Sequence, residues 1–247
     1  MSVIAPDRHC GIVELRRYTT RPGRRADFVE LFTRELADAQ ETAGMTIVGH
    51  FLDLHDPNRL LWFRGFADMA HRRETLERFY GGPVFARVGD AALAMLADSD
   101  DNLLLRPLGS RLGPGGLIDL VTLREGPAPP RPLLATTWYV AAPGDGDLLE
   151  SFGRVGRPAI ERAGLDIVAT LVTDPGPNDV PGLSIRDDVE VFVWLARAGA
   201  VPLATGHEIL AGDPDWVRFQ REEVTPRLVS APEVRMLEPT ARSRLRG

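Results

Sequence analysis

Four polar residues have the types and spacing that proton transfer needs. Glu14 and Arg16 are two residues apart in a stretch that predicts a β-strand, so their side chains share one face about 7 Å apart. His50 and Arg64 fall on the same face of two further predicted strands. A carboxylate in a partly closed space can have a raised pKa, and imidazole titrates near neutral pH. We therefore expect Glu14 or His50 to remove a proton while Arg16 or Arg64 stabilises the resulting enolate.

The same four residues also allow a purely structural interpretation. Glu14 could form an ion pair with Arg16 or Arg64 that holds the sheet in register, and His50 could be a packed, hydrogen-bonded side chain. This alternative stays open at the level of sequence.

Large aromatic residues on the same predicted faces could line a pocket for a flat organic molecule. Equally, they could pack two sheets together and leave no pocket. The residues that we expect to bind the substrate are Tyr18, Trp62, Arg106, Tyr139, Phe192 and Trp194.

The composition excludes several kinds of chemistry. All 29 basic residues are arginines, so a lysine Schiff base and a P-loop lysine are ruled out. His50 and His55 are five residues apart and would face opposite ways on a strand, so we expect no metal site. We expect no cofactor of any kind. Haem ligation through His71 or His207 is a remaining alternative.

Charge and hydropathy limit the partners that we expect. The net charge is −6, and the paired arginines are scattered along the chain, which argues against nucleic-acid binding. No apolar stretch approaches the roughly 20 residues that a membrane span needs. A single cysteine, Cys10, and the lack of a signal-peptide pattern favour the cytoplasm.

The elements that must position these residues follow the order βαββαβ, that of a ferredoxin-like unit. Alternating and 3.6-residue periodicities, with breaks at Gly and Pro, define them. We predict strands over 12–18, 45–52, 60–66 and 102–106, and helices over 25–43 and 68–96, the second broken near 81–83.

The same pattern returns in the second half of the chain. Residues 43–48, Ala-Gly-Met-Thr-Ile-Val, recur as Ala-Gly-Leu-Asp-Ile-Val at 163–168, and Tyr18 matches Tyr139. The run 174–187 is longer than the matching run in the first half, so the number of residues between matching positions of the two halves is larger after this run than before it. We predict strands over 133–140, 165–172, 189–195 and 233–237, and helices over 147–163 and 213–229.

This repetition predicts an α+β protein made of two tandem halves. We assign residues 1–108 to the first half, 109–132 to a Gly/Pro-rich linker with a possible strand at 117–123, and 133–247 to the second half.

Alternation along the strands predicts which face each sheet turns to its helices. The uniformly apolar face, which includes Val13, Leu15, Leu61 and Phe63, should lie under the helices. The mixed faces should then meet in the centre of the molecule. In the second half this face would present Thr137, Tyr139, Val168, Thr170, Glu190, Phe192 and Trp194.

The first predicted strand and the turn after it resemble the NIPSNAP family at residues 13–23, Val-Glu-Leu-Arg-Arg-Tyr-Thr-Thr-Arg-Pro-Gly. The resemblance continues through the predicted helix and the sequence Gly-Met-Thr-Ile-Val-Gly at 44–49 that follows it. The family pattern is a Tyr-Glu-Leu-Arg-x-Tyr strand that leads into Lys/Arg-Pro-Gly, and Val13 replaces its first Tyr. The resemblance covers about residues 11–106 and is weaker in the second half. It implies a dimeric α/β barrel, here formed within one chain. The superfamily includes cofactor-free oxygenases, cyclases and haem enzymes, so the resemblance alone assigns no reaction.

These observations predict a protein that binds a small, mostly apolar or aromatic molecule between its two sheets. We expect a cofactor-independent enzyme of specialised metabolism, a monooxygenase, cyclase or isomerase, acting as a monomeric pseudo-dimer or a homodimer. The alternatives are a non-catalytic module that binds small molecules or proteins, and a haem-binding enzyme of the same fold.

Overall fold

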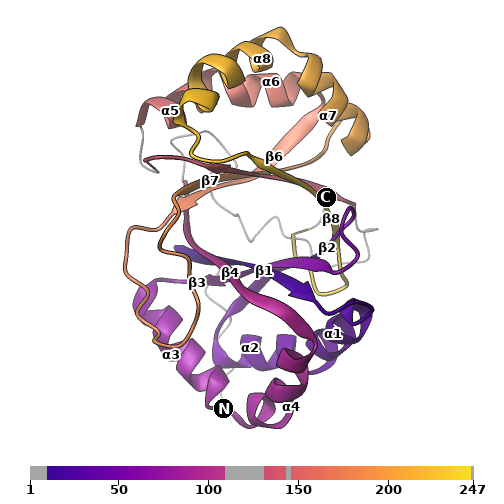
Figure 1. Cartoon of the computed structure of the whole chain (residues 1–247), viewed down its shortest axis with the longest axis vertical. Coiled ribbons are helices and arrows are strands. Elements are labelled where there is room, and N and C mark those ends of the chain that lie inside the picture. Colours follow the sequence, from indigo (N-terminus) through magenta and orange to yellow (C-terminus); the bar gives the residue numbers. More distant parts are fainter. Residues whose placement is uncertain (1–9, 109–130, 143–145, 246–247) are drawn as a thin grey trace.

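The computed structural model describes residues 10–108, 131–142 and 146–245 (Figure 1). The predicted βαββαβ order occurs in both halves of the chain. In the first half the elements are β1 (Ile12–Thr20), α1 (Arg25–Leu31), η1 (Phe32–Leu36), α2 (Ala37–Ala43), β2 (Thr46–Asp53), β3 (Arg59–Phe66), α3 (Met69–Tyr80), α4 (Pro83–Ala94) and β4 (Leu96–Pro107).

The second half repeats this order after the segment 109–130, so the predicted strand at 117–123 lies outside the described residues. Its elements are β5 (Leu133–Tyr139), α5 (Gly146–Ser151), η3 (Phe152–Gly156), α6 (Arg157–Arg162), β6 (Leu165–Thr173), β7 (Val191–Ala198), α7 (Leu203–Gly212), α8 (Pro214–Phe219), η4 (Gln220–Val224), η5 (Thr225–Arg227) and β8 (Glu233–Pro239).

Irregular features recur at an offset of 120 residues. The first helix of each half contains one π-helical turn, which begins at Phe32 and at Phe152. The register of β2 against β3 shifts between Ile47 and Gly49, and that of β6 against β7 shifts between Ile167 and Ala169. Such bulges re-aim the side chains that follow them. The two halves therefore share detailed backbone geometry as well as element order.

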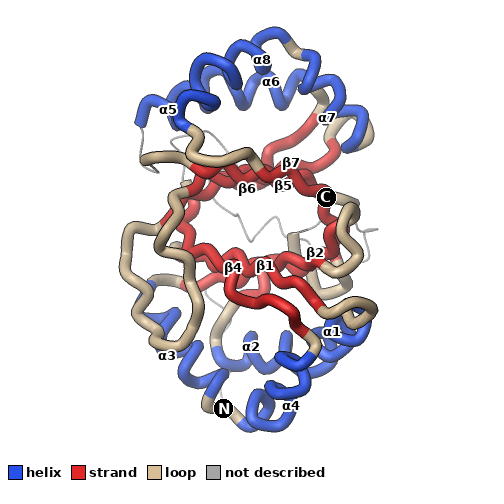
Figure 2. The backbone as a smooth tube through the Cα atoms, viewed as in Figure 1, coloured by secondary structure: helices blue, strands red, loops and turns tan. Residues whose placement is uncertain are grey.

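The eight strands form one closed barrel in the order β1-β3-β2-β8-β5-β7-β6-β4. The halves join edge to edge, because β2 pairs with β8 and β4 pairs with β6. Figure 2 shows the ring of strands with the helices of each half outside it, at opposite ends. Each of these two contacts spans three residue pairs, 51–53 with 237–239 and 105–107 with 171–173, and together they close the barrel.

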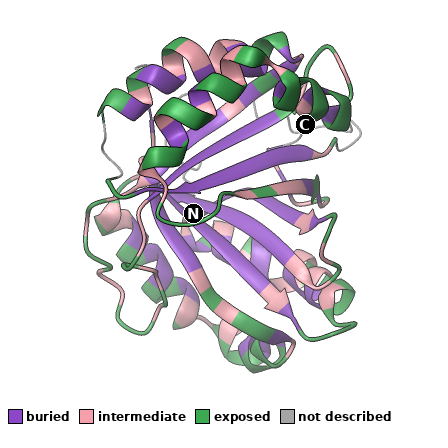
Figure 3. Ribbon diagram, turned by 45° about the horizontal axis from the view of Figure 1, so that its top comes forward, coloured by how far each residue is buried: buried purple, intermediate pink, exposed green. Residues whose placement is uncertain are grey.

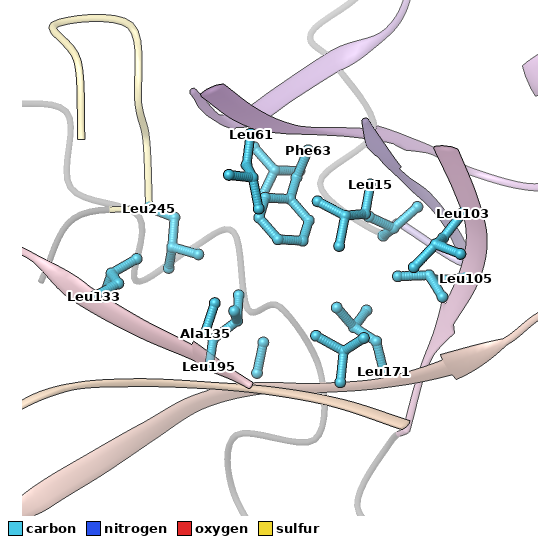
Figure 4. Close-up of a cluster of buried hydrophobic side chains, with 14 of the residues drawn as sticks. Leu15, Leu61, Phe63, Leu103, Leu105, Leu133, Ala135, Leu171, Leu195 and Leu245 are labelled. Carbon is cyan, nitrogen blue, oxygen red and sulfur yellow. The ribbon is translucent and has the colours of Figure 1, made fainter. Parts of the chain in front are cut away.

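The barrel interior is filled by the apolar faces of the two sheets. Leu15, Leu61 and Phe63 from the first half face Leu171 and Leu195 from the second (Figure 4). The prediction that these faces lie under the helices is therefore wrong. The barrel interior is enclosed by strands on all sides, so it takes the uniformly apolar face, and the mixed face turns outwards.

The mixed face of the first half lies under its own helices instead. Tyr18 and Trp62 belong to the core between the sheet and helices α1 to α4, together with Phe28, Phe32 and Phe79. Most strands are accordingly buried along most of their length, whereas β8 and the first half of β4 are partly exposed, and many exposed residues lie on the helices (Figure 3). None of the helices that the structure describes is long and apolar enough to cross a membrane.

Strand register shows which residues of the two halves are equivalent. Arg16 lies opposite Trp62 in the β1–β3 pair, and Thr136 lies opposite Trp194 in the β5–β7 pair. The equivalent of Arg16 is therefore Thr136. The predicted match of Tyr18 with Tyr139 is off by one residue. A one-residue shift turns every side chain to the other face, and Tyr139 accordingly packs in the barrel interior.

Candidate functional site

A cavity of about 490 Å³ lies in the first half, between the outer face of β1 and β3 and the helices that cover it. Its wall is mostly aromatic and aliphatic, as expected for a site that binds a flat organic molecule. The aromatic residues that line it are Tyr18, Phe28, Phe32, Trp62, Phe79, Tyr80 and Phe85.

One end of this cavity is rich in hydrogen-bond donors. Arg16 Nε donates to Tyr18 Oη at 2.7 Å, so the tyrosine hydroxyl keeps its own proton for a further partner. Burial raises the pKa of Tyr18, which keeps that proton in place. Trp62 Nε1 is buried without an acceptor, and Arg16 Nη2 donates to no described residue. This donor group suits a ligand oxygen that carries negative charge.

Glu14 anchors the arginines behind this wall. Its Oε2 accepts from Arg16 Nη1 at 3.0 Å and from Arg64 Nε at 2.7 Å, and its Oε1 accepts from Arg72 Nε at 2.6 Å. Glu14, Arg64 and Arg72 are fully buried, and Arg16 is 3% exposed. Asp179 also pairs with Arg72, so two carboxylates contact three guanidiniums and an excess of positive charge remains beside the cavity.

The electrostatics of this cluster argue against Glu14 as a base. Burial alone would raise the pKa of Glu14, but the charges of Arg64, Arg16 and Arg72 outweigh it and lower the pKa to about 2. A carboxylate with so low a pKa accepts a proton poorly at neutral pH. The expectation of a raised pKa is wrong because the charges of Arg64 and Arg16, together with that of Arg72, which was not anticipated, outweigh the effect of burial.

His50 does not join the charged cluster. Its ring stacks on Phe32 at 4.3 Å between centroids, and its Nδ1 lies 3.2 Å from Thr240 Oγ1. Burial lowers the pKa of His50 to about 3, so the imidazole is neutral near pH 7. His50 does not line the cavity, so the structure supports the packing interpretation of this residue.

Arg72 is the site residue that sequence reasoning missed. It links two parts of the molecule, because it contacts Glu14 on one side and Asp179 and Asn178 on the other. The available signal was its position on α3, where Arg72 shares a helical face with the buried Leu76 and Phe79. A charged residue on an apolar helix face indicates a buried partner.

The long segment 174–190 of the second half extends to helix α3 of the first half (Figure 1). Residues 180–184 line the cavity directly. Asn102 fixes this segment, because its Nδ2 donates to the carbonyl of Ser184 at 2.9 Å and its carbonyl accepts from Arg186 N at 2.8 Å. The insertion that was visible in the repeat therefore contributes to the site.

The remaining predicted substrate residues lie elsewhere. Arg106 is exposed, and it does not line the cavity. Tyr139 accepts a hydrogen bond from Arg17 Nη1 at 2.6 Å in the barrel. Phe192 and Trp194 pack under the helices of the second half. The structure thus groups Glu14, Arg16, Arg64, Tyr18 and Trp62, and it separates the other predicted residues from them.

The two histidines that were considered as haem ligands lie in different halves of the molecule. His71 Nδ1 accepts from the backbone N–H of Ala67 at 3.2 Å, and His207 lines a smaller cavity in the second half. Within residues 10–108, 131–142 and 146–245, no group of three or more His, Cys, Asp or Glu side chains could hold a metal ion.

Comparison with known proteins identifies the family of the first half. The sequence profile of the NIPSNAP family matches residues 13–110, as the N-terminal resemblance predicted. Among curated proteins, no sequence matches this chain.

Solved structures show the fold over the whole chain. An anthrone oxidase-like protein is 14% identical with a TM-score of 0.59, and the alignment covers 95% of this chain and 92% of that one. A candidate monooxygenase from Fusobacterium nucleatum is 7% identical with a TM-score of 0.54, covering 94% and 93%. One from Lactobacillus acidophilus is 13% identical with a TM-score of 0.51, covering 92% and 93%. The predicted dimeric α/β barrel is thereby confirmed.

Proposed function

We propose that this chain, whose residues 13–110 form a NIPSNAP domain, binds a flat, mostly apolar organic molecule in the cavity of its first half and holds an acidic oxygen of that molecule as an anion beside Arg16. The observation that carries this proposal is the unused Nη2 donor of Arg16 at the polar end of an aromatic cavity. The site therefore lies between sheet and helices, and the expectation of a ligand between the two sheets is replaced.

The donors at this end favour the ionised form of a phenol, enol or carboxylic acid. The guanidinium of Arg16, the hydroxyl of Tyr18 and the indole N–H of Trp62 belong to residues that line the cavity and are the donors that we assign to a ligand oxygen. Hydrogen bonds to an anion stabilise it more than its protonated form, so binding lowers the pKa of the ligand. A ligand carbanion or enolate would form more readily here than in water.

Cofactor-independent oxygenation is the reaction that this anion would serve best. An anthrone-type substrate loses a proton to give an enolate, the enolate reacts with dioxygen, and loss of water leaves the quinone; one anthrone and one dioxygen give one anthraquinone and one water. The names of the structural neighbours, a candidate monooxygenase and an anthrone oxidase-like protein, support this choice. Cyclisation or isomerisation of a similar enolate would use the same donors.

The structure changes the expected route of the proton. Glu14 and His50 both have strongly lowered pKa values, so neither suits the role of general base. The carboxylates of Glu77 and Asp100 line the cavity and are themselves solvent-exposed. We propose that the substrate proton leaves towards this rim.

A non-catalytic binding protein is the second candidate. The observation that favours it is the lack of a suitably titrating base among the residues that sequence analysis selected, Glu14 and His50. Such a protein would stabilise the same ligand anion without converting it.

Binding of 4-nitrophenol tests the proposal, because the colour of this probe reports its ionisation directly. We expect the wild-type protein to bind the phenolate and to lower the apparent pKa of the probe by about one unit or more, since one charge-assisted hydrogen bond contributes about 1.5–3 kcal/mol. Arg16→Gln should weaken phenolate binding by about tenfold or more. Arg106→Gln removes an exposed arginine outside the cavity and should leave binding unchanged.

Dioxygen uptake with anthrone separates the two candidates. Anthrone-dependent uptake that is lost in Arg16→Gln supports oxygenation, whereas phenolate binding without uptake supports the binding protein. Absence of saturable 4-nitrophenol binding, or equal binding by Arg16→Gln, would contradict the proposed site.

A further inference from the structure

The second half contains its own cavity, of about 160 Å³, between β5 and β7 and the helices that cover them. Thr136 and Trp194 line it, and they are the equivalents of Arg16 and Trp62 in the first cavity. We propose that this second cavity is a separate binding site for a small planar compound with a neutral carbonyl group. This inference does not depend on the function proposed for the first cavity.

Three polar atoms of residues that line the second cavity have no hydrogen-bond partner among the described residues: Thr136 Oγ1, Trp194 Nε1 and Gln220 Nε2. Thr136 is 3% exposed and Trp194 is 1% exposed, so neither side chain is open to bulk solvent. Buried donors without acceptors are unfavourable and are rare in native proteins. Two N–H donors and a hydroxyl around one small cavity favour a ligand that offers an acceptor oxygen.

The charges around the cavity favour a neutral ligand. Within the part of the chain that the structure describes, no arginine, aspartate or glutamate lines it, and the position of Arg16 in the first cavity is occupied here by an uncharged threonine. A carboxylate would therefore be buried with only His207 as a potential counter-charge. The change from Arg16 to Thr136 gives the two sites different preferences, for an anion in the first half and for a neutral carbonyl in the second.

The size and the walls of the cavity favour a single aromatic ring. An engineered apolar cavity of about 150 Å³ in another protein holds benzene. Three indole rings line this one, with centroid distances of 6.2 Å for Trp138 and Trp216, 5.9 Å for Trp194 and Trp216, and 6.5 Å for Trp138 and Trp194. Such aromatic walls pack well against a planar ring.

The distribution of tryptophans provides a selective readout. The chain has four tryptophans, and Trp62 lies in the first cavity while the other three line the second. In a Trp62→Phe background, all tryptophan fluorescence therefore comes from the second cavity. A ligand that binds in the first cavity of this variant has no tryptophan beside it, so it should change the fluorescence little.

The test is a titration of this Trp62→Phe protein with benzamide, and with benzoate as the charged analogue. We expect a saturable change in emission with benzamide and binding at least tenfold weaker with benzoate. Thr136→Val and Trp194→Phe remove one hydrogen-bonding group each and should weaken benzamide binding by about fivefold. Thr137→Val is the matched control, because the next residue on the strand faces the barrel.

A second readout keeps the proposal falsifiable if one variant folds poorly. The ¹⁹F NMR signal of 4-fluorobenzamide reports binding without tryptophan, and thermal melts identify misfolded variants. Three results would each overturn the proposal. They are a linear, non-saturating fluorescence change, benzoate binding as tight as benzamide binding, and benzamide affinity in Thr136→Val and Trp194→Phe that equals the affinity of the protein without these substitutions. The same variants losing affinity in both assays would support it.

Discussion

Replacing Glu14 with glutamine tests how the charged cluster is balanced. Among the described residues, Glu14 is the one carboxylate that contacts all three of Arg16, Arg64 and Arg72, and all four side chains are buried. The substitution keeps the shape of the side chain but removes its charge. Three guanidiniums then remain, of which only Arg72 keeps an acidic partner, Asp179.

Two lines of reasoning give the magnitude. The pKa of Glu14 falls from 4.5 to about 2, a difference that corresponds to about 3 kcal/mol of stability at neutral pH. Removal of one partner from a buried ion pair costs about 3–5 kcal/mol in other proteins. We therefore expect Glu14→Gln to lower the free energy of unfolding by about 3 kcal/mol and the melting temperature by roughly 6–12 °C.

The pH dependence of this difference has a defined direction. Because the folded-state pKa of Glu14 is below its unfolded value, its contribution is complete above about pH 4.5 and is lost as the pH falls towards 2. The difference between wild type and Glu14→Gln should shrink by about 2 kcal/mol between pH 7 and pH 3. Other titrating groups are common to both proteins and cancel in this comparison.

Urea denaturation at several pH values, followed by circular dichroism, measures this difference. Glu74→Gln is the control, because Glu74 pairs with Arg78 on the surface with 67% of its side chain exposed, and exposed pairs contribute little. The reasoning is refuted if Glu14→Gln costs less than about 1 kcal/mol at pH 7, or if its cost is the same at pH 3.

Three further substitutions test other parts of the structure. His50→Phe should make the free energy of unfolding less sensitive to acid, because burial lowers the pKa of His50 from 6.5 to about 3. Below pH 6.5 the wild type should lose up to about 1.4 kcal/mol of this free energy per pH unit, and the variant should not, as urea titrations would show. Arg72→Met breaks the contact with Asp179 and should speed amide hydrogen exchange in segment 174–190; unchanged exchange would contradict the role of this contact. Gly65→Ala places a Cβ 2.1 Å from Cys10 Sγ and should cost about 1–3 kcal/mol, partly recovered by adding Cys10→Ala, in thermal melts.

The sequence predicted most of the elements, but it missed helix α7 and the first part of β4, and it assigned the faces of the sheets wrongly. Periodicity along 12–18, 45–52 and 60–66 identified strands that the structure confirms, because alternation is a local property of the chain. Which face meets a helix depends on barrel closure through β2–β8 and β4–β6, and these contacts join residues that are far apart in sequence. Local alternation carries no signal for that closure.

The candidate site was predictable only in part, because local alternation predicts which residues share a strand face but not which elements pack together. Glu14, Arg16 and Arg64 could be grouped from strand parity, since neighbouring strands place them on one face. The third arginine, Arg72, comes from α3, and the cover of the cavity comes from 174–190 in the other half. Packing between elements brings Arg72 and this segment to the site, and the spacing of residues along one strand does not predict such packing.

The sequence by itself determined the element order, the repeat, the lack of lysine chemistry and three members of the charged cluster, Glu14, Arg16 and Arg64. Only the tertiary structure decided that this cluster holds Glu14 ionised, that His50 is neutral, and that the two cavities carry Arg16 and Thr136 at equivalent positions. The physical reason is that a pKa depends on every charge within a few ångströms and on burial, whatever the separation along the chain. Residue types fix which groups can ionise, and packing fixes the state they adopt.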